Sequence, residues 1–314
     1  MTLEKTIPID QELVNIFGVN DQNLNYLKSL FPNLEINVRG NVVYINGSSK
    51  DTQEATRILD EMITMGSKNE TIEIPDLELI AKIKNPEKLE NSKVSQLNVI
   101  DNKFIKVKNL NQFKYLETID NSTITFGIGP AGTGKTFLAV ASAVKMYSEN
   151  KIKKIVLTRP AVEAGERLGY LPGDLSQKID PYLVPLFDSL EYFFGNETLQ
   201  YLIDKRNIEI VPLAYMRGRT LNDACIILDE AQNATISQIK MFLTRLGENS
   251  KMIITGDETQ IDLNNRTFSG LKKTRKTLSK IEEVSVLEFE NTDIVRNKIA
   301  VSYTHLTLPT ILLV

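Results

Sequence analysis

The chain has 314 residues, of which 42% are hydrophobic and 25% are charged, and its formal net charge is −3. This apolar content is enough for one large core or two smaller ones, and the single cysteine, Cys225, excludes an internal disulfide framework. No apolar run approaches the roughly 20 residues that span a bilayer, and residues 1–5 do not resemble a leader. We therefore expect a cytoplasmic protein with no membrane contact, and no global basic field for polyanions, although a local groove could be positive.

Residues 1–66 are predicted to form a small α+β module. We expect strands over 6–9, 34–38 and 42–46, and helices over 22–30 and 55–65. This order resembles a KH domain, but KH domains clamp RNA with a G-x-x-G loop, and no such loop stands between the predicted helices. Because acidic residues also outnumber basic ones here, we favour protein docking or oligomerisation over RNA binding as the role of this module.

Residues 67–102 are polar and charged, and Pro75 and Pro86 bracket one predicted helix, so we expect a partly structured linker. From 103 to 300, apolar segments alternate with helical stretches, a pattern typical of a doubly wound parallel sheet in an α/β domain. The predicted strands of this sheet are 124–128, 154–158, 208–211, 224–228, 251–255 and 284–287.

Residues 129–136 match the phosphate-binding pattern G-x-x-x-x-G-K-[ST], between an apolar strand and an uninterrupted helix. The pattern predicts that Lys135 reaches the β- and γ-phosphates of ATP and that Thr136 ligates Mg²⁺, while the backbone of the loop cradles the phosphates. The predicted cradle consists of Gly129, Pro130, Ala131, Gly132, Thr133, Gly134, Lys135 and Thr136. An ordinary glycine-rich turn is the alternative, which the flanking strand and helix disfavour.

Two further polar groups follow predicted strands. Asp229 and Glu230 end the apolar run 225–228, and we expect Asp229 to hold Mg²⁺ and Glu230 to orient or deprotonate the attacking water. Gln260 follows the strand 251–255 and is our candidate sensor of the γ-phosphate. A surface strand end with two acids and an ordinary Gly-Asp turn are the respective alternatives.

Taken together, these motifs resemble the first motor domain of superfamily 1 helicases and, more closely, the PhoH family of bacterial ATPases. The resemblance covers 103–300 and rests on residues 129–136, 158–174, 180–182, 215–220, 229–233, 256–260 and 293–296. It implies a P-loop NTPase of the additional-strand class, in which the strand before Gln260 lies between the phosphate-loop strand and the acidic strand. It also implies Mg²⁺-dependent ATP hydrolysis linked to RNA metabolism, often beside an endoribonuclease.

Two site residues follow from the resemblance together with their chemistry. Gln112 stands upstream of the phosphate loop, as an adenine-reading glutamine does in related motors, although a surface glutamine is the alternative. Arg296 resembles an arginine that stabilises charge on the γ-phosphate, with a plain surface arginine as its alternative. Because one motor domain lacks the second domain that completes a helicase site, we expect a homo-oligomeric ring, hexameric by analogy, in which Arg296 acts on a neighbour's nucleotide.

The segment after the second strand corresponds to the part of related motors that contacts single strands. We predict an RNA-facing set of Arg159, Arg167, Arg217 and Arg219, with surface salt bridges as the alternative. Two functions therefore compete: an ATPase coupled to RNA as a helicase or remodeller, and a nucleotide-gated oligomeric switch without unwinding activity. ATP is favoured over GTP because no guanine-reading N-K-x-D motif follows the acidic strand.

Residues 301–314 contain no Asp, Glu, Lys or Arg, directly after a segment dense in charge. Family members are expected to continue a charged helix here, so our hypothesis is that this tail is foreign to the native protein. The only histidine of the chain, His305, lies in the tail, and we assign it no catalytic or metal-binding role.

Overall fold

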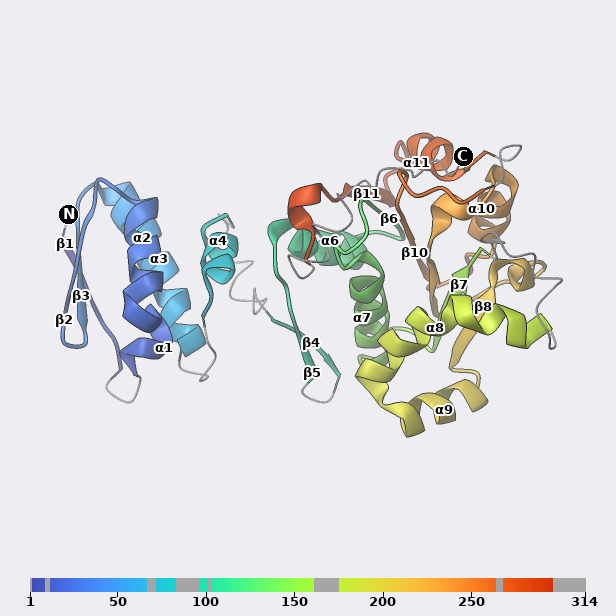
Figure 1. Cartoon of the computed structure of the whole chain (residues 1–314), viewed down its shortest axis with the longest axis horizontal. Helices are drawn as coiled ribbons and strands as arrows, with labels where there is room; N and C mark the ends of the chain where they lie inside the picture. Colours follow the sequence, from blue (N-terminus) through green and yellow to red (C-terminus); the bar gives the residue numbers. More distant parts are fainter. Residues whose placement is uncertain are drawn as a thin grey trace, which may run out of the picture. The chain divides into compact units, whose positions relative to one another are not determined.

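The computed structural model of the chain describes residues 2–8, 12–66, 72–82, 96–100, 103–160, 175–263 and 268–295. Two compact units divide the chain, the first formed by 1–97 with 106–110 and the second by 98–105 with 111–314 (Figure 1). Each unit has its own sheet. The predicted tail 301–314 lies outside the described residues.

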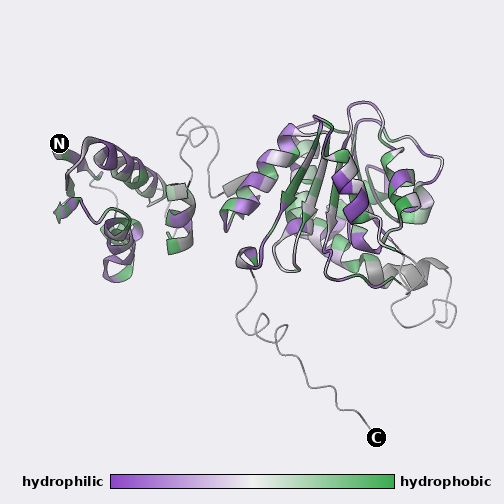
Figure 2. Cartoon of the chain, turned by 90° about the horizontal axis from the view of Figure 1, so that it is seen from above, coloured by the Kyte–Doolittle hydropathy of each residue, from purple (hydrophilic) through white to green (hydrophobic). Residues whose placement is uncertain are grey.

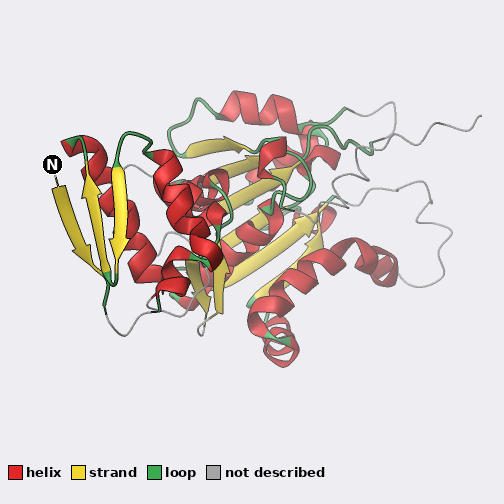
Figure 3. Cartoon of the chain, turned by 60° about the vertical axis from the view of Figure 1, so that its left-hand side comes forward, coloured by secondary structure: helices red, strands yellow, loops and turns green. Residues whose placement is uncertain are grey.

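The first unit places helices on one face of a three-stranded antiparallel sheet (Figure 3). The order of the strands is β1 (Thr2–Thr6), β3 (Val42–Asn46) and β2 (Glu35–Arg39). The helices are α1 (Leu13–Phe17), α2 (Gln22–Leu30), α3 (Ser49–Gly66) and α4 (Ile74–Lys82), with a 3₁₀ turn over Val19–Asp21. The predicted hairpin and the helix over 22–30 are confirmed, and the helix predicted over 55–65 begins earlier, where the Ser48 hydroxyl accepts the Asp51 amide.

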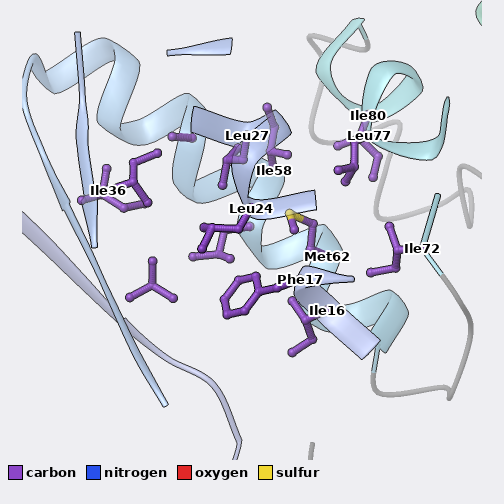
Figure 4. Close-up of a cluster of buried hydrophobic side chains, with 14 of the residues drawn as sticks. Ile16, Phe17, Leu24, Leu27, Ile36, Ile58, Met62, Ile72, Leu77 and Ile80 are labelled. Atoms are coloured by element: carbon purple, nitrogen blue, oxygen red, sulfur yellow. The ribbon is translucent and has the colours of Figure 1, made fainter. Parts of the chain in front are cut away.

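A single apolar cluster holds this unit together, and it draws on the sheet and on all four helices (Figure 4). Leu27, Ile58 and Met62 are fully or almost fully buried in it. Leu77 and Ile80 of α4 belong to the same cluster, and each buried side chain of this size contributes about 1.5–3 kcal/mol. A helix from the segment that we predicted as a linker is therefore part of this core.

The strand predicted over 6–9 is wrong. The strand β1 ends at Thr6, while Ile7 lies beyond it with its side chain fully buried and its amide bonded to the Asn41 carbonyl. Pro8 has no amide hydrogen to donate to a ladder, which is a physical reason for the strand to stop before it. The apolar residues after Thr6 misled the prediction, because β1 itself is a polar strand of exposed and half-buried side chains.

The second unit is built on a parallel six-stranded sheet. The strand order is β11 (Val284–Glu288), β6 (Ile124–Ile128), β10 (Lys251–Gly256), β9 (Ala224–Leu228), β7 (Lys154–Arg159) and β8 (Ile208–Pro212). Every strand predicted for this sheet is confirmed to within two residues. The predicted insertion is also confirmed, since β10 lies between the strand of the phosphate loop, β6, and the acidic strand, β9. A separate two-stranded sheet pairs β4 (Gln96–Ile100) with β5 (Lys103–Lys106).

Helices cover both faces of the six-stranded sheet, so that its hydrophobic strands lie in the interior (Figure 2). They are α6 (Leu110–Asn121), α7 (Lys135–Ser148), α8 (Leu175–Phe194), α9 (Asn196–Asp204), α10 (Ile236–Leu243) and α11 (Leu271–Leu278), with 3₁₀ turns over Leu213–Met216, Ala231–Asn233 and Asn291–Asp293. One face of the strands packs against α10 and α11 through Phe242 and Leu271. Among the described helices, none combines the length and apolarity needed to cross a membrane.

Candidate functional site

The loop between β6 and α7 has a backbone that only glycine adopts easily. Gly132 and Gly134 have φ angles of 85° and 86°, in the left-handed region, and α7 begins directly after Gly134. A Cβ atom on Gly129 would lie 2.6 Å from the carbonyl oxygen of Phe289. The predicted loop is therefore present at a helix N-terminus, where backbone N–H groups and the helix dipole favour a bound anion.

Lys135 is the first residue of α7, and its side chain folds back over the loop. Its Nζ donates to the carbonyl oxygens of Gly129 and Pro130, at 2.7 Å each, and the residue is only 8% exposed. The ammonium group therefore lies inside the phosphate loop, on oxygens of the protein backbone.

Asp229 is the point where four secondary-structure elements meet. It follows β9 directly and is 2% exposed. Its Oδ1 accepts the hydroxyls of Thr136 on α7, at 2.7 Å, and of Thr255 on β10, at 2.5 Å. Its Oδ2 accepts the guanidinium of Arg159, at the end of β7, with 2.7 Å to Nε and 2.5 Å to Nη2. The predicted pair of Thr136 and Asp229 is thus brought within hydrogen-bonding distance.

Glu230 occupies the left-handed region with a φ of 54°, which is uncommon for a residue other than glycine and recurs at active sites. Its side chain is 43% exposed. One carboxylate oxygen accepts Nε2 of Gln232 at 2.5 Å, and Oε1 of Gln232 accepts the amide of Asp257 at 3.0 Å. Gln232, which is 1% exposed, therefore links the end of β9 to the end of β10.

The link continues into the phosphate loop through Asp257. Its Oδ2 accepts the backbone amide of Ala131 at 3.1 Å, and its Oδ1 accepts the hydroxyl of Thr259 at 2.6 Å. No role was predicted from the sequence for Gln232, Thr255 or Asp257. Gln232 lies in the motif segment 229–233 and Asp257 in 256–260, and Thr255 stands at the strand end beside the second segment. This proximity to the motifs was the available signal.

An open pocket of about 290 Å³ lies over these groups. It is lined by Ala131, Gly132, Gly134, Lys135, Thr136, Phe137, Arg159, Pro185, Ser189, Asp229, Glu230, Gly256, Asp257 and Gln260. The structure therefore brings Lys135, Thr136, Asp229, Glu230 and Gln260 to one pocket, as the sequence indicated, although their chemical roles stay predictions.

The remaining predicted residues are distributed differently. Gln112 is 5% exposed, and its Nε2 donates to the Thr133 carbonyl at 2.9 Å, so it supports the loop from α6; adenine reading stays a prediction. Arg217 is exposed, and Arg219 forms an ion pair of 2.6 Å with Glu209. Burial raises the pKa of Glu209, but hydrogen bonds from Lys154 and Arg219 outweigh it, and the net shift is downward.

Arg159 lines the pocket, in contact with the acidic pair, whereas we placed it in the RNA-facing set. The other two predicted arginines, Arg167 and Arg296, lie outside the described residues. The four arginines of the RNA-facing set are therefore not shown to share one surface.

The oxygen groups at the pocket fit a magnesium ion that keeps waters and phosphate oxygens among its ligands. Mg²⁺ is typically held by one or two carboxylates together with substrate phosphates, and here the Asp229 carboxylate and the Thr136 hydroxyl adjoin the phosphate loop. Within the described ranges, no group of three or more His, Cys, Asp or Glu side chains forms a metal site from protein ligands alone. The parallel sheet with β10 inserted, the loop and the acidic strand end together define a P-loop NTPase.

Comparison with known proteins gives the family. Residues 104–306 match the family described as PhoH-like protein. The chain is 44% identical to the PhoH-like protein of Bacillus subtilis (strain 168) over 305 residues, which cover 95% of this chain and 94% of that protein. It is 45% identical over 291 residues to the PhoH-like protein of Mycobacterium tuberculosis (strain H37Rv), covering 91% and 82%. This chain belongs to the PhoH-like protein family.

Protein PhoH of Escherichia coli (strain K12) is 41% identical over 203 residues, which cover 64% of this chain and 57% of that protein. Among solved structures, the Sulfolobus solfataricus SWI2/SNF2 ATPase core in complex with dsDNA has 18% identity and a TM-score of 0.32, covering 51% of this chain and 34% of that chain. The Pif1 helicase from Candida albicans has 14% identity and a TM-score of 0.31, covering 62% and 41%.

Proposed function

We propose that this protein binds ATP with Mg²⁺ and hydrolyses it, and that it couples hydrolysis to RNA metabolism. The observation that carries the ATPase proposal is the convergence of Lys135, Thr136, Asp229 and Glu230 on one pocket beside the phosphate loop. A binding loop alone accounts for affinity, whereas a carboxylate beside the phosphate site adds a group that can activate water.

The residues divide the work by their chemistry. The N–H groups of the loop and the N-terminus of α7 bind the phosphates. The Lys135 ammonium exchanges its backbone carbonyl partners for phosphate oxygens. Thr136 and Asp229 would hold Mg²⁺, which when bound neutralises charge on the phosphates. Glu230 orients or deprotonates the attacking water, and Gln260, exposed at the pocket, contacts the γ-phosphate.

Gln232 keeps Glu230 in position for this role. Its amide donates to one oxygen of Glu230, so the carboxylate is fixed at one end and presents its other oxygen to the pocket. Because Gln232 also accepts from the Asp257 amide, and Asp257 accepts from Ala131, a change at the phosphate loop can shift the group that handles the water.

RNA is the polymer to which we propose that hydrolysis is coupled, with the protein acting as a helicase or remodeller beside an endoribonuclease. Support comes from membership of the family, to which the motifs of the sequence also point, and from the exposed Arg217. The homo-oligomeric ring, hexameric by analogy, and the action of Arg296 across its subunits belong to the same proposal.

A nucleotide-gated oligomeric switch is the second candidate, and one observation favours it. Two of the four arginines that we expected to face RNA, Arg159 and Arg219, are engaged in ion pairs with acidic groups of the same unit. A protein that used ATP to change its oligomeric state or its partner would not need these arginines on a nucleic-acid surface.

Steady-state ATP hydrolysis with and without single-stranded RNA tests both candidates. The Glu230→Gln variant is the control for contaminating ATPases, because it keeps the loop and removes only the carboxylate charge. Stimulation by RNA that disappears in the variant supports the RNA-coupled ATPase, whereas turnover indifferent to RNA supports the switch. Turnover equal in both proteins would refute ATP hydrolysis at this site.

The ring is tested by mixing Arg296→Ala with Glu230→Gln protein. If Arg296 serves the nucleotide of a neighbour, mixed rings contain some complete sites, and activity returns above that of either variant. A mixture as inactive as its components would contradict sharing between subunits.

A further inference from the structure

Both oxygens of the Asp229 carboxylate already have side-chain partners within the protein. Two hydroxyls, from Thr136 and Thr255, bond one oxygen, and the Arg159 guanidinium bonds the other through both Nε and Nη2. The side chains of Arg159 and Asp229 are only 16% and 3% exposed. A buried carboxylate requires a positive partner, and here Arg159 supplies it.

The strand order explains why these two residues meet. Strands β7 and β9 are parallel neighbours in which Thr158 pairs with Leu228, and the Asp229 amide donates to the Thr158 carbonyl at 2.9 Å. Arg159 and Asp229 are therefore the next residues of two adjacent strands at the same edge of the sheet. The register of these two strands therefore fixes which side chains meet at this edge.

The same carboxylate is the one that we assign to the divalent cation. A cation at Asp229 and the Arg159 guanidinium require the same negative charge, and a second positive group close to the ion would be repelled by it. Nη2 of Arg159 also lies 3.8 Å from Oε1 of Glu230, so the arginine already faces both acids of the pocket.

We propose that Arg159 competes with the divalent cation for the Asp229 carboxylate of the nucleotide site. The inference rests on the proposed function, because it assumes that Asp229 is the carboxylate that holds the cation. When the cation binds with nucleotide, the guanidinium leaves Asp229 and stays in the pocket that it lines, where its planar fork of donors suits a phosphate group. Arg159 thereby opposes binding of the cation alone and favours binding of the cation together with the nucleotide.

Titration with Mn²⁺ in the absence of nucleotide tests this competition directly. Electron paramagnetic resonance counts free Mn²⁺, so the measurement depends neither on hydrolysis nor on RNA. We expect Arg159→Gln to bind Mn²⁺ at least about tenfold more tightly than the wild type, equivalent to about 1.4 kcal/mol. With ADP present, this gain is expected to shrink or reverse, because the variant has lost a donor to the phosphates.

Arg219→Gln is the matched control, since Arg219 is also a partly buried arginine in an ion pair at 2.6 Å, but its partner is Glu209 on β8. It is expected to leave the affinity for Mn²⁺ unchanged. Adding Asp229→Asn to Arg159→Gln is expected to abolish the gain. Equal affinities in wild type and Arg159→Gln, or a gain that persists without the Asp229 charge, would overturn the proposal.

If Arg159→Gln fails to fold, Arg159→Lys decides the question in its place. Lysine keeps the charge but cannot form the two-point contact with one oxygen, so an affinity for Mn²⁺ above that of the wild type is expected. An affinity equal to the wild type would count against the competition. If the wild type shows no ATP hydrolysis while the Mn²⁺ titrations give the expected result, this inference stands and only the proposed enzymatic activity is refuted.

Discussion

The only thiol of the chain should be almost inert in the folded protein. Cys225 lies in β9, the third strand from one edge of the six-stranded sheet and the fourth from the other, and is fully buried. Burial raises the pKa of its thiol from the ordinary value of 9.0 to about 12. At pH 8 the reactive thiolate is then about one molecule in 10⁴, compared with about one in ten for an ordinary cysteine, a difference of about 1,000-fold before shielding is counted.

The assay is the reaction with an aromatic disulfide reagent at pH 8, followed by absorbance. We expect no fast phase in the folded protein and one thiol per chain in urea, where the pKa is ordinary and the sulfur is accessible. Slow labelling of the folded protein then measures opening of the central sheet. A ligand at about 100 times its Kd stabilises the folded state by about 2.7 kcal/mol, so Mg²⁺ with ADP should slow labelling by about 100-fold.

Two results would refute this reasoning. Complete labelling of the folded protein within the mixing time would mean that β9 is not buried. Labelling that nucleotide fails to slow, at concentrations shown to saturate binding, would mean that Cys225 is exposed by a local motion that leaves the nucleotide site intact.

Three other changes have defined expectations. The Tyr115 hydroxyl is buried and has no hydrogen-bond partner within the described part of the chain, so Tyr115→Phe should leave the free energy of unfolding unchanged or raise it by up to about 1–3 kcal/mol; a loss of stability in urea titration would show a partner for the hydroxyl. Gln232→Ala should lower kcat by about tenfold or more with little change in nucleotide affinity, because it releases Glu230 while the Asp257 carboxylate still accepts the Ala131 amide of the phosphate loop; an unchanged kcat would remove Gln232 from the mechanism. Glu209 has a pKa below its ordinary value of 4.5, so its stabilising effect is complete above that pH and is lost as the pH falls through the lower pKa of the folded state. The stability difference between wild type and Glu209→Gln should therefore shrink as the pH falls below about 4.5, and a difference that is constant with pH would contradict the assignment.

The strands of the second unit could be predicted because each is a short apolar run with turn residues on both sides. Ala224–Leu228 is buried at every position, as expected for a strand covered on both faces. The strand β1 could not be found in this way, because its residues are exposed or half buried and its pairing with β3 depends on a partner about 40 residues away. The role of α4 in a core was hidden for a related reason, since the helix is only nine residues long and the polar segments around it dominate the composition.

The residues of the candidate site that could be predicted are those whose type and spacing a local motif fixes. The phosphate loop and the pair Asp229 and Glu230 needed only local sequence, since the chemistry fixes the spacing. Arg159 needed the strand order as well. Its position after the second strand indicated a nucleic-acid contact by analogy, and only the adjacency of β7 and β9 shows that it meets Asp229. Gln232 needed still more, because its role depends on two hydrogen bonds in opposite directions.

The contacts of Lys135 and Arg159, the basic residues that line the pocket within the described ranges, bear on how this site selects its ligand. The Lys135 ammonium is held by backbone carbonyls and the Arg159 guanidinium by a carboxylate, so an incoming phosphate must replace contacts that already exist. Phosphate oxygens can replace the backbone carbonyls that hold Lys135. Release of Arg159, however, leaves the buried Asp229 carboxylate without a positive partner, which is costly. A divalent cation that arrives with the nucleotide removes this cost. If Arg159 competes for Asp229 as proposed, we expect the site to favour the magnesium complex of the nucleotide over either component alone.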